Sequence, residues 1–281
     1  MTISPKPMRN EIVEKNVRDA LAEDVGSGDL TAGLVPDEIV SAHVVARETA
    51  TLCGRHWFDE TFRQIDPAIT INWQLRDGDP VQPDTIVCRL RGHAHGLLTG
   101  ERTALNFLQL LSGTATVARQ YADAVAGTAT RVLDTRKTVP GLRDAQKYAV
   151  TCGGCHNHRH GLYDAVLIKE NHIRAAGSIA AVLEKAITTN QPGILIEIEV
   201  ENLDQLQQAI TAGATRVLLD NFPVEQLRQA VEIAAGKVEL EASGGISLDN
   251  IQRFSATGVD FISVGSLTKH VRAIDLSMRF D

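Results

Sequence analysis

Positive and polar side chains gather in one stretch of this 281-residue sequence. A short apolar segment, 131–133, is followed by Asp134-Thr135-Arg136-Lys137, and a Pro140-Gly141 pair then interrupts regular structure. Further along, the apolar segment 165–168 ends in Lys169-Glu170-Asn171-His172. A buried strand that delivers side chains to a site at its C-terminal end has this pattern.

The charge of this region runs against that of the whole chain. Between Arg131 and Arg174 there are eight Lys or Arg and four Asp or Glu, although the formal net charge of the protein is -7. A locally cationic cleft in an acidic protein favours an anionic small molecule, whereas nucleic acid would require a basic face across a domain. The sequence therefore predicts no nucleic-acid partner.

Composition and the N-terminal segment predict a soluble, cytoplasmic protein. The chain is 43% hydrophobic and 22% charged, which is ordinary for a globular protein with a sizeable core. No apolar run approaches the roughly 18 residues that a membrane-spanning helix needs. The polar residues 1–24 have the pattern of neither a signal peptide nor a transit peptide.

Cysteine spacing raises an alternative of another class. Cys53 and Cys88 are predicted to be buried and to pack as small hydrophobic residues. The segment Cys152-Gly153-Gly154-Cys155-His156, however, fits the haem-attachment pattern and also half of a zinc site. Covalent haem normally accompanies export, and no second Cys-x-x-Cys pair supplies further zinc ligands. A metal- or haem-binding module therefore remains the alternative to an anion-binding enzyme.

The first part of the chain predicts a small unit of mixed structure. Apolar residues at helical spacing indicate a helix over 10–24, and short strand-like segments come next, separated by Asp, Pro and Gly turns. A second helical pattern covers 97–126, with an interruption near Ser112-Gly113. We expect a mostly antiparallel α+β unit with strands at 43–47, 69–73 and 85–90.

After residue 130 the pattern alternates regularly between strand and helix, which predicts parallel strands joined by helical crossovers. The sheet could be open and doubly wound, or closed into a barrel. Every predicted strand ends in a polar or glycine-rich group, which favours the barrel because its active site lies at the C-terminal strand ends. The predicted strands are 131–134, 164–168, 193–200, 215–219, 237–242 and 260–264, and the predicted helices are 143–152, 178–189, 202–212, 223–235 and 247–256.

Strand periodicity places carboxylates inside this barrel. In the segment 194–200 the isoleucines share one face and the two glutamates share the other, and Glu239, Glu241 and Ser243 share a face of a later strand. Interior carboxylates are costly unless cations match them, and Arg136, Lys137 and Lys169 are the candidates. A purely structural ion network is possible, but clustering at strand ends favours function.

The last two strand ends carry glycine turns, Ser243-Gly244-Gly245 and Val264-Gly265-Ser266. Backbone N–H groups at a helix N-terminus bind anions, and α/β barrels commonly bind phosphate at their final two loops. The pair of turns predicts a phosphorylated ligand.

Longer motifs extend these features over nearly the whole chain. They lie at 101–106 (ERTALN), 111–116 (LSGTAT), 134–143, 153–154, 157–162, 169–172 (KENH), 197–200 (EIEV), 219–221 and 241–246 (EASGGI). Together they resemble quinolinate phosphoribosyltransferases, the family also called nicotinate-nucleotide pyrophosphorylases (carboxylating). The family pattern does not require Cys-His between Gly154 and Asn157, which weakens the metal and haem interpretation.

The resemblance implies a fold and an activity. It implies an α+β sandwich domain (1–112), then an incomplete α/β barrel (113–270) of six to seven strands. The tail 271–281 is a candidate to pack back onto the first domain. The implied oligomer is a homodimer. The implied enzyme is a pentosyltransferase of NAD biosynthesis that uses phosphoribosyl pyrophosphate (PRPP) and quinolinate, with Mg²⁺. Its products are nicotinate mononucleotide, pyrophosphate and CO₂. The alternative within this class is a related transferase with another anionic acceptor, such as nicotinate.

The resemblance also implies roles for single residues. Arg136, His158 and Arg159 match the positions that hold quinolinate, with Lys137 and Lys169 beside them, and arginine suits this task because its fork can bind a carboxylate through two hydrogen bonds.

The remaining implied site residues surround the phosphoribosyl donor. Arg102 matches a position that the neighbouring subunit contributes, Glu199 and Asp220 hold ribose hydroxyls or Mg²⁺, and Thr135 belongs to the substrate-binding set. Residues 243–245 and 264–266 bind phosphate. The implied catalytic residues are Lys137, Lys169, Glu199 and Asp220.

Overall fold

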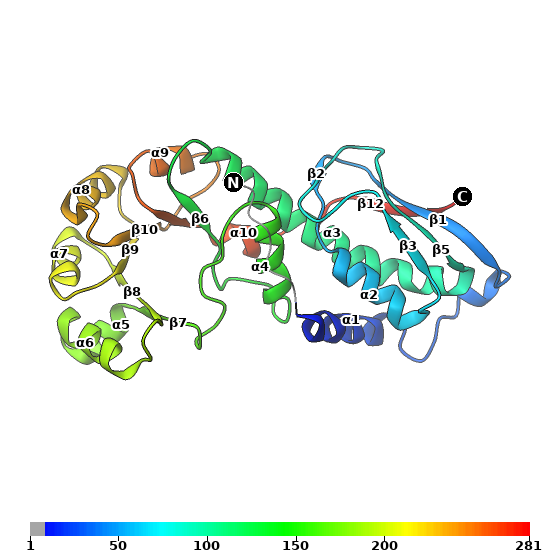
Figure 1. Ribbon diagram of the computed structural model, residues 1–281, viewed down its shortest axis with the longest axis horizontal. Helices are drawn as coiled ribbons and strands as arrows, with labels where there is room; N and C mark the ends of the chain where they lie inside the picture. The colour runs from blue at the N-terminus through cyan, green and yellow to red at the C-terminus, as the bar shows by residue number, and fades with distance from the viewer. Residues whose placement is uncertain (1–8) are drawn as a thin grey trace. The chain divides into compact units, whose positions relative to one another are not determined.

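The computed structural model describes residues 9–281, which divide into two units (Figure 1). Of the described residues, 9–119, 138–154 and 267–281 form the first unit, and 120–137 and 155–266 form the second. The first unit thus takes in a helix, α4 (Arg143–Cys152), that comes after the first strand of the second unit in the chain. Its buried residues, such as Tyr148, pack with Val17 of α1 (Asn10–Asp24) and with Trp57.

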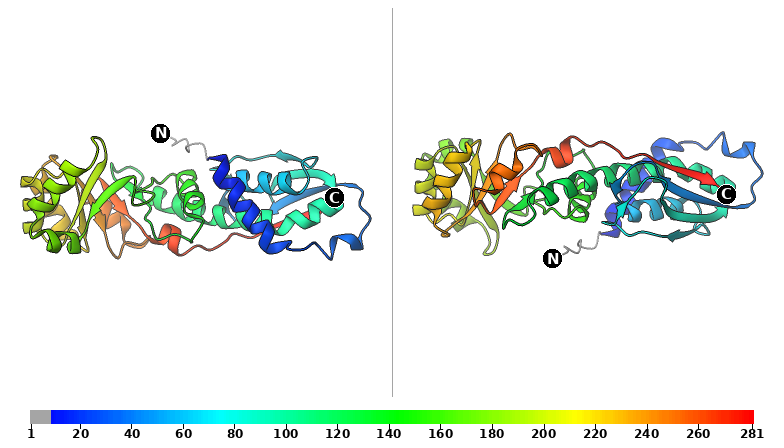
Figure 2. Two further views of the ribbon diagram at one scale, coloured as in Figure 1. Left: turned by 90° about the horizontal axis from the view of Figure 1, so that it is seen from below. Right: turned by 90° about the horizontal axis from the view of Figure 1, so that it is seen from above.

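The first unit is built on an antiparallel sheet, as predicted. Strand order is β12-β1-β5-β3, and helices α2 and α3 supply Phe58, Phe62, Leu97 and Leu105 to the core beneath it. Strand β12, from the far end of the chain, pairs with β1 from Ala42↔Phe280 to Ala46↔Leu276 (Figure 2). The elements are η1 (Ala32–Leu34), β1 (Ile39–Ala46), β2 (Ala50–Thr51), α2 (Arg55–Ile65), β3 (Thr70–Trp73), β4 (Pro80–Val81), β5 (Ile86–His93), α3 (Ala94–Ala124), α10 (Ser266–Lys269) and β12 (Leu276–Phe280).

Helix α3 runs without a break for 31 residues, so the predicted interruption near Ser112-Gly113 is wrong. Both residues are small because other chain segments approach the helix there. The Ser112 hydroxyl accepts a hydrogen bond from the Cys53 N–H (2.9 Å) and donates one to the Cys53 carbonyl (3.0 Å). A Cβ on Gly113 would lie 2.1 Å from the Arg272 carbonyl oxygen. A close contact therefore produces the same sequence pattern as a helix end.

The second unit contains all six predicted strands in one parallel sheet of order β6-β11-β10-β9-β8-β7. Figure 1 shows α6, α7 and α8 along the outer face of this sheet. The short helix α5 was not predicted. The elements are β6 (Arg131–Leu133), β7 (Ala165–Ile168), α5 (Glu170–Ala176), α6 (Ile179–Thr189), β8 (Leu195–Val200), α7 (Leu203–Thr211), β9 (Arg216–Asp220), α8 (Val224–Ala234), β10 (Glu239–Ser243), α9 (Ile251–Ser255) and β11 (Phe261–Ser263).

The segment 156–159 spans the gap between the two edge strands. On one side His156 forms a parallel bridge to Leu133 of β6, and on the other the Arg159 guanidinium donates to the Ala165 carbonyl of β7 (3.1 Å). The sheet is thus completed by an irregular segment where a regular barrel would have further strands. This arrangement confirms the predicted incomplete barrel.

Among the described residues, no helix is long and apolar enough to cross a membrane.

Substitution Gly113→Ala should lower the free energy of unfolding by about 1–3 kcal/mol, because the added methyl group forces α3 away from the chain at Arg272. Thermal and urea unfolding measure this change. The matched control is Gly33→Ala, where a Cβ meets nothing within 4 Å. Equal stability of the two variants would contradict the close packing of α3.

Candidate active site

The C-terminal ends of the six parallel strands meet at one edge of the sheet. Strand register places Asp220 beside Ser243, and Glu199 lies two residue pairs earlier, beside Leu218. Lys169 comes directly after the last residue of β7, and Thr135 lies just beyond β6. Residues that are far apart in the sequence therefore come together at one edge, as the strand pattern predicted.

Lys169 and Glu199 form an ion pair at this edge, with 2.7 Å between Nζ and a carboxylate oxygen. The Lys169 side chain is 51% exposed and that of Glu199 is 17% exposed. An ion pair open to solvent contributes little to stability, so both groups can exchange this contact for one with a ligand.

Arg136 and Arg159 bring two guanidinium groups close together. Burial lowers the pKa of Arg159, the positive charge of Arg136 lowers it further, and Asp164 and Glu197 act in the opposite direction. The buried Nε of Arg136 has no hydrogen-bond partner among the described residues. Two half-buried cations with spare donor capacity favour an anion that carries more than one carboxylate.

The two glycine turns lie against other predicted site residues. A Cβ on Gly244 (φ +102°) would lie 2.1 Å from the side-chain oxygen of Asn221, whose amide group donates to Asp220 (2.8 Å). A Cβ on Gly265 would lie 3.0 Å from Cδ of Lys137 and 3.6 Å from the Thr135 hydroxyl. Glycine at both positions lets the backbone approach these side chains.

The helices that come after the two glycine turns differ from the prediction. After the turn at 243–245, the sequence pattern predicted a helix that begins at residue 247. Helix α9 in fact begins at Ile251, several residues after the turn. The turn at 264–266 leads into α10, which has only four residues. Backbone N–H groups of the turns, more than helix N-termini, are therefore the donors available to a phosphate.

The interior carboxylates lie where strand periodicity predicted them. Glu197 and Glu241 are 1% and 0% exposed. Glu199 pairs with Lys169, as expected, but the partner of Glu197 is His158 (Nε2 to carboxylate oxygen, 2.9 Å), and Glu239 pairs with Arg216 (2.6 Å). Reasoning from charge alone overlooked these two partners, because strand register and the segment 156–159 determine which side chains meet.

Asp134 anchors the segment 156–159 and was not singled out as a site residue. It is fully buried, and its two carboxylate oxygens accept hydrogen bonds from the His158 N–H (2.9 Å) and the Asn157 side chain (2.6 Å). The one available signal was an aspartate directly after a buried strand. This carboxylate fixes the backbone that carries His158 and Arg159.

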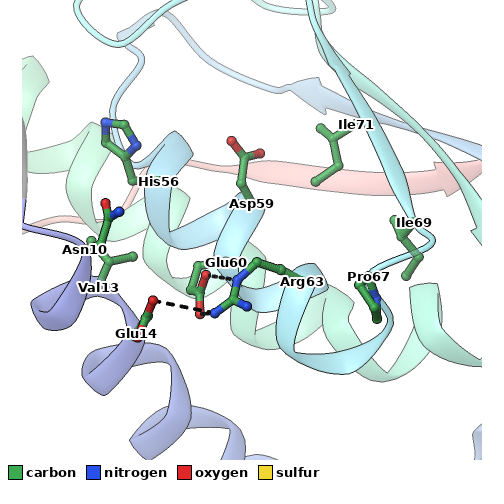
Figure 3. A pocket seen from close by; sticks show the side chains of 10 residues that line it. All are labelled: Asn10, Val13, Glu14, His56, Asp59, Glu60, Arg63, Pro67, Ile69 and Ile71. Carbon is green, nitrogen blue, oxygen red and sulfur yellow. Dashed lines mark hydrogen bonds and ion pairs between the residues drawn. The ribbon is translucent and has the colours of Figure 1, made fainter.

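Three other features lie in the first unit. Arg102 is exposed on α3, and Cys152 lies near Cys53 and Asp77, all within 4.8 Å of one another by their ligand atoms. A pocket of about 460 Å³ lies between α1, α2 and β3 (Figure 3). Its one arginine, Arg63, is already bound by Glu60 (2.6 Å), and none of the predicted site residues line it.

Comparison with known proteins identifies relatives of the whole chain. A family model described as quinolinate phosphoribosyl transferase, C-terminal domain, matches residues 114–279, and one for the N-terminal domain matches 29–112. The probable nicotinate-nucleotide pyrophosphorylase (carboxylating) of Bacillus subtilis is 39% identical over 95% of this chain and 92% of that protein, and that of Synechocystis is 40% identical over the same shares. The structure of the nicotinate-nucleotide pyrophosphorylase from Francisella tularensis superposes with a TM-score of 0.97, at 48% identity over 100% of both chains.

Substitution Asp134→Ala should lower the free energy of unfolding by about 2–4 kcal/mol, because two hydrogen bonds to a buried carboxylate are lost. Urea unfolding measures the loss, and hydrogen exchange should show faster exchange in the segment 156–159. Glu232→Ala, on the exposed surface of α8, is the control and should stay within about 0.5 kcal/mol of the wild type. Unchanged protection of 156–159 in Asp134→Ala would contradict the anchoring role.

Proposed function

The chain belongs to the quinolinate phosphoribosyl transferase family, and we propose that it transfers the 5-phosphoribosyl group of PRPP to the ring nitrogen of quinolinate, with decarboxylation. The products are nicotinate mononucleotide, pyrophosphate and CO₂. The observation that carries the choice of acceptor is a pair of neighbouring half-buried arginines, Arg136 after β6 and Arg159 in the irregular segment 156–159.

Quinolinate carries two adjacent carboxylates on a flat ring, so its site needs several cations within a short distance. Arg136 and Arg159 supply two planar guanidinium groups, and Lys169 lies at the same sheet edge. Each bidentate contact between arginine and carboxylate is stronger than a neutral hydrogen bond. His158 lies beside this pair, with its ring held by Glu197.

The phosphoribosyl donor suits the part of this sheet edge formed by β8, β9, β10 and β11. Glu199 and Asp220 offer carboxylate oxygens to the ribose hydroxyls, and the glycine turns at 243–245 and 264–266 offer backbone N–H groups to phosphate. The Lys137 side chain lies against Gly265, where it can neutralise an anionic oxygen.

The reaction requires charge stabilisation more than proton transfer. As pyrophosphate leaves C1 of the ribose, positive charge builds on the sugar, and the inward carboxylates Glu199 and Asp220 stabilise it. Lys137 and Lys169 stabilise the leaving group while the ring nitrogen attacks. When the 2-carboxylate then leaves as CO₂, the electron pair of the broken bond stays on C2, where the quaternised nitrogen stabilises it, and a proton from water takes the place of the carboxylate.

The donor set also suits Mg²⁺. Mg²⁺ in nucleotide enzymes is held by one or two carboxylates and by substrate phosphates, and Glu199 and Asp220 are hard oxygen ligands at the correct edge. When bound, the ion would neutralise charge on the pyrophosphate group.

A homodimer would complete the site. We assign Arg102, exposed on α3, to the quinolinate site of the neighbouring subunit, where it would add a third guanidinium group. A related transferase with a monocarboxylate acceptor is the second candidate, because a single carboxylate could also bind to Arg136 and Arg159. The family match spans the Cys152–His156 segment and favours the transferase over a metal- or haem-binding module.

Substitution of Arg136 or Arg159 by alanine should weaken quinolinate binding roughly 10- to 150-fold, as expected for the loss of one charged hydrogen bond of about 1.5–3 kcal/mol. PRPP binding should not change. Calorimetry with each substrate tests this, and pyrophosphate release tests the overall reaction with quinolinate and with nicotinate. Arg228→Ala, on α8, is the control. Quinolinate affinity at the wild-type level in both variants would remove the assignment.

Mixing inactive Arg102→Ala and Lys137→Ala subunits should restore part of the activity if Arg102 acts across the dimer. A mixed dimer then contains one site with both residues intact, so roughly a quarter of all sites become active after random exchange of subunits. Pyrophosphate release after unfolding and refolding the mixture measures this recovery. A mixture as inactive as its parents, in a sample shown to be dimeric, would argue against sharing.

A further inference from the structure

Two carboxylates inside the second unit contact neither substrate in the scheme above. Glu197 and Glu241 face each other across the inner sheet surface, and both are at least 99% buried. One oxygen of Glu197 and both oxygens of Glu241 accept no hydrogen bond from the described residues. Burial and the charge of Glu197 together raise the pKa of Glu241 to about 8, and the nearby His158 acts in the opposite direction.

This arrangement costs stability. Buried carboxylates that lack hydrogen-bond partners are unfavourable, and replacing buried ionic groups by apolar residues of similar volume is often neutral or stabilising. A pair of such groups beneath a substrate site therefore indicates a functional requirement.

A chain of hydrogen bonds connects these carboxylates to the proposed quinolinate site. Nε2 of His158 donates to Glu197 (2.9 Å) and lies 3.7 Å from Glu241. Nδ1 of the same ring accepts the backbone N–H of Arg159 (2.7 Å). This acceptor role leaves the ring proton on Nε2, which faces Glu197, so the two contacts together fix the tautomer and the orientation of the ring.

Arg159 is held at both of its ends. Its backbone N–H is bound by the His158 ring, and its guanidinium donates to the Ala165 carbonyl of β7. The direction in which Arg159 presents its remaining donors therefore depends on the His158 ring, and through it on Glu197.

We propose that Glu197 and Glu241 are positioning residues of the acceptor site, which hold the His158 ring and thereby orient Arg159 toward the quinolinate carboxylates. The inference rests on the proposed function. Glu241 acts on the same ring nitrogen as Glu197: one of its carboxylate oxygens lies 3.7 Å from Nε2 of His158, where it attracts the ring proton.

The experiment compares substrate binding with stability in Glu241→Met, Glu241→Gln and Glu197→Gln. Methionine has the length of glutamate without its charge, so Glu241→Met should unfold at the same or a higher temperature than the wild type. At the same time its quinolinate KM should rise about tenfold, the effect of losing one well-oriented hydrogen bond, while the PRPP KM stays constant.

Conservative variants supply the second readout. Glu241→Gln keeps a polar oxygen beside Nε2 of His158, so this variant should keep most of the quinolinate affinity. Glu197→Gln should weaken quinolinate binding, because a neutral amide holds the His158 ring less strongly than a carboxylate does. The control is Glu239→Gln on the same strand, which pairs with Arg216 and should leave both KM values unchanged.

The outcomes separate this inference from the proposed function. If wild-type protein does not release pyrophosphate with quinolinate and PRPP, the proposed function fails. If the wild type is active and Glu241→Met and Glu197→Gln bind quinolinate as it does, the positioning role fails. A fall in unfolding temperature with equal loss for both substrates would show that the pair is structural. If Glu241→Met does not fold, the two glutamine variants decide by the same KM comparison.

Discussion

A carboxylate on the inner face of a closed sheet is stable only if a nearby group neutralises its charge. This requirement determines which side chains meet in the second unit. The carboxylates of these strands have different partners: Glu199 pairs with Lys169, Glu197 with His158, and the half-exposed Glu239 with Arg216. Within the described part of the chain, the one cation-forming group within ion-pair distance of Glu241 is His158, at 3.7 Å, and the raised pKa of Glu241 reflects the same constraint.

The irregular segment 156–159 links this interior to the site. It completes the sheet between β6 and β7 and is anchored by the buried carboxylate of Asp134. A regular strand in its place would present alternate side chains to the two faces. The irregular backbone instead lets His158 reach Glu197 in the interior while its neighbour, Arg159, bonds to the edge of β7. The gap in the barrel is thus where His158 and Arg159, the proposed acceptor-binding residues, are held.

The residues at the strand ends differ in charge from one part of the sheet to another, and this difference follows the strand order. Residues after β6, β7 and in the irregular segment are cationic and suit a dicarboxylate. Those after β9, β10 and β11 are acidic or glycine-rich and suit a ribose and its phosphate groups. Parallel register brings both groups to one edge, so the two substrates can meet there without any nucleophilic side chain. In the proposed reaction, placed charges rather than a covalent intermediate would supply the catalysis.

The sequence by itself determined the alternation of strands and helices, the inward faces of 195–200 and 239–243, and the residues at the strand ends, because these depend on local periodicity and on the shared direction of parallel strands. It could not distinguish a helix break from a close contact at Ser112-Gly113, since both require small residues. Only the tertiary structure decided that His158 pairs with Glu197 and that Asp134 anchors the segment beside it. Those partners lie 39 and 24 positions apart, and chain folding alone brings them together.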